Sequence, residues 1–148
     1  MAENDGKKIE KATAQAFKKL MDGGKAVVTR QYDTKSAGFF LPPSPADFMG
    51  VLNSKASLIE CKSSDYAHSF ADCNLKGYIE PTQFAYHKLW VKQKGQSLFV
   101  FHSVPMNLIE VWKGEDVLKA YSSSEALGLP LATCDFNVKK LAKVMEVI

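Results

Sequence analysis

The chain has 148 residues and a formal net charge of +3, with 46% hydrophobic and 24% charged residues. This composition is typical of a globular protein and excludes a disordered chain. No apolar run reaches the roughly 18–20 residues of a membrane-spanning helix, and the polar first residues lack the apolar middle of a secretory signal. We therefore expect one domain over residues 1–148, with no membrane partner.

The three cysteines (Cys61, Cys73 and Cys134) are odd in number and include no CxxC pair. This pattern predicts neither a disulfide framework nor a zinc site, and it indicates a cytoplasmic protein with reduced thiols. The lysines gather in groups near both ends of the chain. Such groups are typical either of solvated helix faces or of a surface that follows nucleic-acid phosphates.

The first part of the chain predicts a helix, a strand and a loop. Residues 4–21 read as an amphipathic helix with apolar residues at helical spacing, namely Ile9, Ala12, Ala16, Phe17 and Leu20. Residues 25–32 alternate and are β-branched, which favours a strand. Residues 34–45 contain a glycine and three prolines, which indicates a short loop or arm.

The remainder predicts a hairpin and then alternating helices and strands. Residues 46–52 and 56–63 form the hairpin, and residues 63–76 are expected to be a mobile loop. A helix follows over residues 81–94, with Pro81 in its first turn. Strands at 96–104 and 107–113, a short helix after Glu115 and a last helix from about Asn137 complete the chain. The order is α-β-β-β-α-β-β-α, a mixed α/β fold.

The hairpin carries Asp47, Glu60 and Lys62 on apolar segments, where an ionised side chain is costly unless it is paired. Alternation places Glu60 and Lys62 on one face of their strand, and antiparallel pairing returns Glu60 to the neighbourhood of Asp47. Two carboxylates suit Mg²⁺, which activates water for attack on a phosphate, and a lysine can neutralise the developing charge. The alternative is a surface strand with an ordinary salt bridge.

Asp47 followed by Glu60, Cys61 and Lys62 resembles the active-site motif of the PD-(D/E)XK nuclease superfamily. The segments SPADFMGV, LIECKSS, IEPTQFAYHKLWVKQKG, SLFVFHS and CDFNVKKLAKVMEVI extend this likeness over nearly the whole chain, which resembles the RecU-type Holliday-junction resolvases. The resemblance implies a restriction-endonuclease-like core, a mixed β-sheet flanked by helices. Bacteriophages often encode small resolvases of this kind, so it also implies the cytoplasm of a bacterium or a phage-infected host.

The resemblance implies a role for each motif residue. Asp47 and Glu60 would bind Mg²⁺, for which Mn²⁺ would substitute, together with the backbone carbonyl of Cys61. Lys62 would assist the attack. A redox or zinc role for the Cys61 thiol is the rival interpretation. The family also places a glutamate of the first helix near the metal, and Glu10 matches it, although Glu10 could equally pair with a lysine one turn away.

Gln83 matches a polar residue that related nucleases present from the helix after the motif, where it would orient the water or a phosphate. His87 follows one turn later and could approach DNA, but we expect surface or sheet packing for His68, His87 and His102. The resemblance further suggests that Ser44 touches phosphate, although turn chemistry before Pro45 explains it as well.

DNA would be bound through its phosphates and shape. Candidates for backbone contacts, or simply for exposed charge, are Arg30, Lys35, Lys55 and Lys76. Two symmetric cuts require two sites, which predicts a two-fold homodimer. Its interface could use exposed aromatic residues that could equally belong to the core, namely Phe39, Phe40, Trp90 and Trp112.

Two features depart from the family pattern. Ala46 separates the proline of the motif from Asp47, and residues 34–43 are much shorter than the stalk of the bacterial relatives. The expected function is nevertheless that of a divalent-metal-dependent endonuclease that resolves four-way DNA junctions by paired nicks. The alternatives are a phage, restriction or repair endonuclease acting on duplex, nicked or flapped DNA, and a catalytically weak DNA-binding recombination accessory protein.

Overall fold

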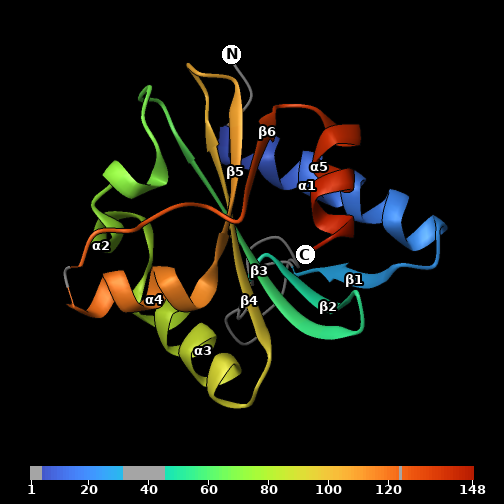
Figure 1. Cartoon of the computed structure of the whole chain (residues 1–148), viewed down its shortest axis with the longest axis horizontal. Coiled ribbons are helices and arrows are strands. Elements are labelled where there is room, and N and C mark those ends of the chain that lie inside the picture. The colour runs from blue at the N-terminus through green and yellow to red at the C-terminus, as the bar shows by residue number, and fades with distance from the viewer. Residues whose placement is uncertain (1–4, 32–45, 124) are drawn as a thin grey trace, which may run out of the picture.

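The chain folds into a six-stranded mixed β-sheet with helices on both faces (Figure 1). A computed structural model describes residues 5–31, 46–123 and 125–148. The expected arm at residues 34–45 lies outside these ranges. The helical elements are α1 (Asp5–Asp22), the short 3-10 helix η1 (Phe70–Asp72), α2 (Leu75–Tyr78), α3 (Pro81–Lys92), α4 (Gly114–Ser123) and α5 (Val138–Glu146). The strands are β1 (Ala26–Arg30), β2 (Phe48–Leu52), β3 (Lys55–Ser64), β4 (Gln96–Ser103), β5 (Leu108–Lys113) and β6 (Ala132–Asp135).

The strands lie in the sheet in the order in which they occur along the chain, β1-β2-β3-β4-β5-β6. Only β3 and β4 are parallel, and the other neighbouring pairs are antiparallel. A parallel pair needs a crossover, and the segment holding η1, α2 and α3 supplies it. The two central strands are therefore joined over the face of the sheet that α3 covers.

Strands β2 and β3 form the hairpin that the sequence predicts, with Leu52 paired with Lys55 next to its turn. Asn53 and Ser54 form its two-residue turn with φ angles of 51° and 66°, which are the left-handed values that a tight hairpin turn requires. Phe48 pairs with Ile59 at the other end of the hairpin. Because pairing is antiparallel, Asp47, which directly precedes β2, lies opposite Glu60.

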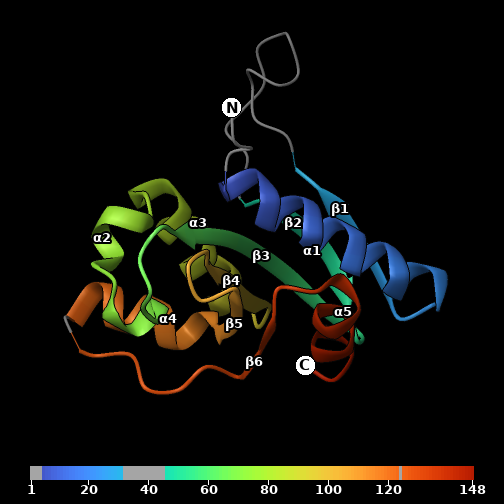
Figure 2. The same ribbon diagram turned by 90° about the horizontal axis from the view of Figure 1, so that it is seen from above.

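Each face of the sheet buries its own apolar cluster. Helices α1 and α5 cover one face and α2, α3 and α4 cover the other (Figure 2). The apolar residues predicted for the first helix (Ile9, Ala12, Ala16, Phe17 and Leu20) are all buried on the first face. Phe70, Phe99 and Phe101 pack with Trp112 on the second face, so Trp112 is a core residue rather than part of an exposed interface.

The observed order of elements differs from the expected one. Helix α2 and strand β6 are additional, whereas α4 is the short helix expected after Glu115, which the expected order of elements left out. The loop expected at residues 63–76 is confirmed at 65–69 and 73–74 and is wrong elsewhere, because β3 continues to Ser64 and η1 and α2 interrupt the segment. The segment is held by burial of Phe70 and by Glu110, whose Oε1 accepts hydrogen bonds from Ser69 Oγ and Phe70 N at 3.0 and 2.9 Å.

Within the described residues, no helix combines the length and apolar character that crossing a membrane requires.

Candidate active site

The hairpin brings the two predicted carboxylates together. Asp47 Oδ2 accepts a hydrogen bond of 2.7 Å from the backbone N–H of Cys61, which holds the Asp47 side chain against β3 beside Glu60. Glu60 is almost completely buried, and Asp47 is partly buried. The convergence predicted from strand alternation is therefore confirmed.

Lys62 and Glu60 are joined through Gln83 of α3. The Lys62 ammonium donates to Gln83 Oε1 at 3.0 Å, and Gln83 Nε2 donates to Glu60 Oε1 at 3.0 Å. The ammonium also lies 4.0 Å from the same Glu60 oxygen. The structure thus brings Gln83 beside Lys62 and Glu60, where the resemblance placed it.

The start of α3 fixes the orientation of Gln83. The helix begins at Pro81, and the backbone N–H of Glu80 donates to Gln83 Oε1 at 3.0 Å, as in one half of a capping box. Both groups that face Gln83 Oε1 can only donate, and the group that faces Nε2 is a carboxylate. These partners leave a single arrangement of the amide.

His87, one turn after Gln83, contacts the other oxygen of Glu60. The imidazole is completely buried, with Nε2 at 3.2 Å from Glu60 Oε2 and Nδ1 at 2.7 Å from Ser97 Oγ. Burial lowers the pKa of His87 to about 4, so the ring is neutral at pH 7. We infer the tautomer in which Nε2–H donates to Glu60 and Nδ1 accepts from the Ser97 hydroxyl.

The packing expected for His87 is correct, because the ring packs against Phe99, but its contact with Glu60 was not predicted. The four-residue spacing from Gln83 is the signal that could have revealed it, since residues i and i+4 share a helix face. His68 stacks on Tyr66 and His102 is buried against Phe136, which agrees with the packing expected for both.

The two carboxylates hold protons more tightly than ordinary acidic side chains. Burial, followed by the charge of Glu60, raises the pKa of Asp47 to about 8 despite the hydrogen bond from Cys61. Burial also raises the pKa of Glu60 to about 7, although the nearby Lys62 charge opposes the shift. A site with this excess of buried negative charge is stabilised by a bound cation.

Glu10 reaches the same region from α1. Its Oε2 accepts a hydrogen bond of 2.8 Å from Arg30 at the end of β1, and its charge contributes to the raised pKa of both Asp47 and Glu60. The partner of Glu10 is therefore Arg30 rather than a lysine of α1. The structure places Glu10 and Arg30 beside the carboxylates, as predicted.

Cys61 contributes its backbone rather than its thiol. The side chain is buried in the cluster under α1, 3.5 Å from Thr13 Oγ1, and burial raises the pKa of the thiol well above its usual range. A buried, protonated thiol neither binds metal nor reacts readily. This arrangement argues against the redox or zinc role and leaves the backbone of Cys61 between Asp47 and Lys62.

Two of the predicted DNA contacts lie away from this site. Lys55 pairs with Leu52 at the turn end of the hairpin, five residues from Glu60, or about 17 Å along an extended strand. The Lys76 ammonium lies 5.9 Å from the centre of the Tyr121 ring, on the side of α4. Neither side chain therefore lies at the carboxylates, and the role of both lysines as DNA-backbone contacts stays a prediction. Ser44, Lys35, Phe39 and Phe40 lie outside the described residues.

Trp90 remains at the surface of α3 but is half-buried. Its indole Nε1 donates to the backbone carbonyl of Ala56 at 3.2 Å, so the ring is fixed against the start of β3. Its part in a subunit interface stays a prediction.

The oxygen donors of the site fit a hard divalent cation. Among residues 5–31, 46–123 and 125–148, no group of three or more His, Cys, Asp or Glu side chains is arranged to hold a metal ion. Mg²⁺, however, commonly takes only one or two protein carboxylates and completes its shell with water and phosphate oxygens. Asp47 and Glu60, side by side and with excess negative charge, match that requirement.

No protein-family model matches this chain, and no curated protein matches it in sequence. The resemblance to the PD-(D/E)XK nucleases accordingly stays a prediction. The function is therefore inferred from the chemistry of the residues in the site.

Proposed function

We propose that this chain is a divalent-metal-dependent DNA endonuclease with a restriction-endonuclease-like core. One observation carries the proposal: two buried carboxylates, Asp47 and Glu60, lie side by side next to the Lys62 ammonium. Burying charges in this way costs stability, because burial raises the pKa of both acids and the charge of Glu60 raises that of Asp47 further. Because ionisable side chains with such raised pKa values often belong to active sites, this cluster on two paired strands is a candidate catalytic site.

The topology is consistent with this proposal. Three antiparallel strands, β1 to β3, are followed by a helical crossover to β4, which is parallel to β3. Helix α1 packs behind the strands that carry the acids, and α3 packs in front of them. The core of the PD-(D/E)XK nucleases, as the resemblance implies it, is likewise a mixed sheet flanked by helices.

Asp47, Glu60 and the backbone carbonyl of Cys61 would hold the metal ion. Bound there, Mg²⁺ or Mn²⁺ supplies a lowered pKa for a bound water and a positive charge for the phosphate oxygens. The raised pKa of both acids means that metal and protons compete for the same oxygens. Metal binding therefore requires deprotonation of Asp47 near neutral pH.

Lys62 supplies the positive charge that the protein itself brings to the reaction. Its side chain is 15% exposed, and Gln83 fixes the ammonium on the Glu60 side of the strand. A fixed ammonium in a partly desolvated position stabilises the charge that develops on a phosphate during hydrolysis, and it can orient the attacking water. Gln83 hydrogen-bonds to both side chains and so fixes the position of the Lys62 ammonium relative to the Glu60 carboxylate.

The proposed substrate is a branched DNA, the four-way junction. Arg30 lies at the end of β1 beside the acids. It can contact one DNA phosphate while Lys62 contacts another. One such site cuts one strand, so paired symmetric nicks require a two-fold homodimer with a site in each subunit. Phage-encoded or bacterial recombination would supply this substrate in the cytoplasm.

A cleavage assay with three substrates tests the proposal. A labelled four-way junction, a linear duplex and a flap of the same sequence are incubated with the protein in Mg²⁺ or in EDTA, and with Asp47→Asn as the inactive control. We expect paired nicks in the junction, in Mg²⁺ only, and with the unsubstituted chain only. Absence of metal-dependent cleavage of every substrate would overturn the nuclease assignment.

The same assay separates the alternatives. Equal cutting of duplex, nicked or flapped DNA would indicate a phage, restriction or repair endonuclease instead of a resolvase. Junction binding without cleavage would indicate a recombination accessory protein. Because Asp47, Glu60 and Lys62 are all present, an endonuclease is favoured over an accessory protein without catalytic activity.

A further inference from the structure

An exposed aromatic pair, Tyr66 and His68, lies just beyond the end of β3 that carries the candidate active site. Tyr66 is 68% exposed, and its ring stacks on the imidazole of His68, with the ring centroids 5.7 Å apart and the ring planes at 17°. The imidazole can cover only one face of the Tyr66 ring, so this exposure leaves the opposite face open to solvent. An open aromatic face is a surface on which a planar ligand can stack.

Hydrogen bonds fix the backbone of the aromatic pair, although both residues lie outside the helices and strands. The backbone N–H of Tyr66 donates to Ser64 Oγ at 3.1 Å, and the Tyr66 carbonyl accepts from Ser103 Oγ, at the end of β4, at 2.9 Å. The backbone N–H of His68 donates to the same carbonyl at 3.0 Å. A surface that is already ordered binds a ligand without the entropy cost of ordering a loop.

The chain directly after the aromatic pair is anchored by a buried carboxylate. Glu110 Oε1 accepts hydrogen bonds from Ser69 Oγ at 3.0 Å and from Phe70 N at 2.9 Å. The indole Nε1 of Trp112 donates to the same oxygen at 3.1 Å, and Phe70 is completely buried. The segment is therefore held on both sides of the aromatic pair, and the position of Tyr66 relative to β3 is fixed.

This position is close to the proposed phosphate contact of Lys62. Lys62 and Ser64 project from the same face of β3, where Gln83 contacts Lys62 and Tyr78 Oη donates to Ser64 Oγ at 3.2 Å. Tyr66 follows two residues later. Four residues span at most about 14 Å from Lys62 to Tyr66, which corresponds to about four nucleotide steps of roughly 3.4 Å. A DNA strand whose phosphate contacts Lys62 can therefore bring a nearby base to Tyr66.

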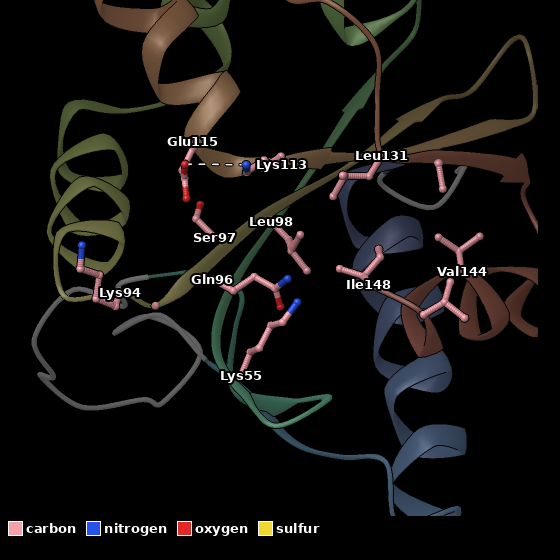
Figure 3. A pocket seen from close by; sticks show the side chains of 13 residues that line it. Lys55, Lys94, Gln96, Ser97, Leu98, Lys113, Glu115, Leu131, Val144 and Ile148 are labelled. Atoms are coloured by element: carbon pink, nitrogen blue, oxygen red, sulfur yellow. Dashed lines mark ion pairs between the residues drawn. The ribbon is translucent and has the colours of Figure 1, made fainter.

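The opposite end of β3 offers a different kind of surface. A cavity of about 520 Å³ opens there, between the starts of β3 and β4 and the C-terminal helix (Figure 3). Leu98 and Val144 belong to its lining, and none of the described residues that line it is aromatic. Trp90 also lies at this end, but its ring is half-buried and its Nε1 donates to the Ala56 carbonyl. The open aromatic face is thus at the end of β3 that carries Lys62.

We infer that Tyr66 stacks on an unpaired base of the bound DNA, within about four nucleotides of the phosphate that Lys62 contacts. A base inside a continuous duplex is stacked on both faces by its neighbours, and taking it out of the stack costs free energy. Only a base that is already unpaired, as at a gap or an opened branch point, reaches the tyrosine without this cost. The protein should therefore prefer such DNA to continuous duplex. The inference rests on the proposed function, which supplies DNA as the substrate.

DNA binding in EDTA tests the inference without cleavage. The probe is a duplex with a short single-stranded gap that holds the fluorescent base 2-aminopurine, and the reference is the continuous duplex of the same sequence. We expect the full chain to quench the 2-aminopurine fluorescence saturably, because stacking on an aromatic ring quenches it. The quenching should be lost in Tyr66→Ala and retained in Tyr66→Phe, which keeps the ring.

Affinities of the same variants, measured by fluorescence anisotropy, give a second readout. Tyr66→Ala should weaken binding of the gapped duplex about tenfold and change binding of the continuous duplex by less than about twofold. Tyr86→Ala removes another exposed tyrosine, from α3, and is the matched control that should change neither affinity. Quenching that persists in Tyr66→Ala, or equal affinity loss for both DNAs, would overturn the inference.

These outcomes are distinct from those of the cleavage assay. Metal-dependent cleavage together with binding that does not depend on Tyr66 would overturn the stacking inference alone. Binding that depends on Tyr66, without metal-dependent cleavage of any substrate, would overturn the nuclease assignment alone and support the stacking inference.

Discussion

Gln83 Nε2 donates a hydrogen bond of 3.0 Å to Oε1 of Glu60. The Oε1 atom of the same amide accepts from the Lys62 ammonium and from the backbone at the start of α3. The carboxylate and the ammonium are therefore held in one geometry by a residue whose own rotamer the helix terminus fixes. Residues with this role are as sensitive to substitution as the groups that they position.

Gln83→Ala should lower DNA cleavage about ten- to hundredfold, because Glu60 and Lys62 lose their common partner. Single-turnover cleavage rates at saturating Mg²⁺ measure the effect. Thr82→Ala, at an exposed neighbouring position of the same helix, is the matched control and should cleave normally. Rates within twofold of each other for the two variants would show that Gln83 has no positioning role.

Lys62→Met should reduce the cleavage rate by at least about a hundredfold, because the positive charge beside the reacting phosphate is lost. DNA affinity, measured by fluorescence anisotropy, should change much less, since a single phosphate contact is removed among several. Lys55→Met makes the same substitution at the other end of β3, where the side chain is exposed, and should leave the rate unchanged. Equal loss in both variants would indicate that general charge, not position, matters.

His87→Ala should weaken Mn²⁺ binding about tenfold, because one oxygen of Glu60 loses its donor. His87→Gln, which keeps an N–H donor on a longer side chain, should restore part of the affinity, and calorimetry with Mn²⁺ measures both. His102 is buried to a similar extent but lies on the other face of the sheet, against Phe136, so His102→Ala is the control for loss of a buried ring. If His102→Ala weakens Mn²⁺ binding equally, the loss in His87→Ala comes from lower stability of the fold and not from the lost contact with Glu60.

The raised pKa values predict how stability depends on pH. Because the folded pKa of Asp47 and of Glu60 (about 8 and about 7) lies above the ordinary values of 3.8 and 4.5, the folded state binds protons more tightly than the unfolded state. This contribution is fully present below pH 4 and is lost as the pH rises through 7 and 8. His87, with its lowered pKa of about 4, acts in the opposite direction only below about pH 6.5.

The metal-free chain should therefore lose on the order of 2 kcal/mol of unfolding free energy between pH 6.5 and 8.5. Urea unfolding in EDTA measures this change. Asp47→Asn, which cannot ionise, should flatten most of the slope, and saturating Mg²⁺ should reverse it by stabilising the ionised acids. A metal-free stability that rises over this interval would show that the two acids are not buried together.

The convergence of Asp47, Glu60 and Lys62 was predictable because local rules determine it. A two-residue turn at Asn53 and Ser54 sets the register of β2 and β3, and strand alternation then places the side chains. The apolar stripe of α1 was predictable for the same reason, since helical spacing alone identifies its buried face. These features need no knowledge of distant contacts.

Other parts depend on packing between segments distant in sequence. The contact of His87 with Glu60 joins residues 27 positions apart, and α3 lacks the strong apolar stripe that would have indicated its buried face. Strand β6 has four residues, and its pairing with β5, rather than its composition, makes it a strand. The distance of Lys55 from the acids follows from register, which charge grouping does not reveal.

A crystal of the chain soaked in Mn²⁺ tests the central claim most directly. The account predicts an anomalous-difference peak between the carboxylates of Asp47 and Glu60, within bonding distance of both, and no peak there in Asp47→Asn. A wild-type crystal with no ion between these side chains, or with the two carboxylates turned away from each other, would contradict it.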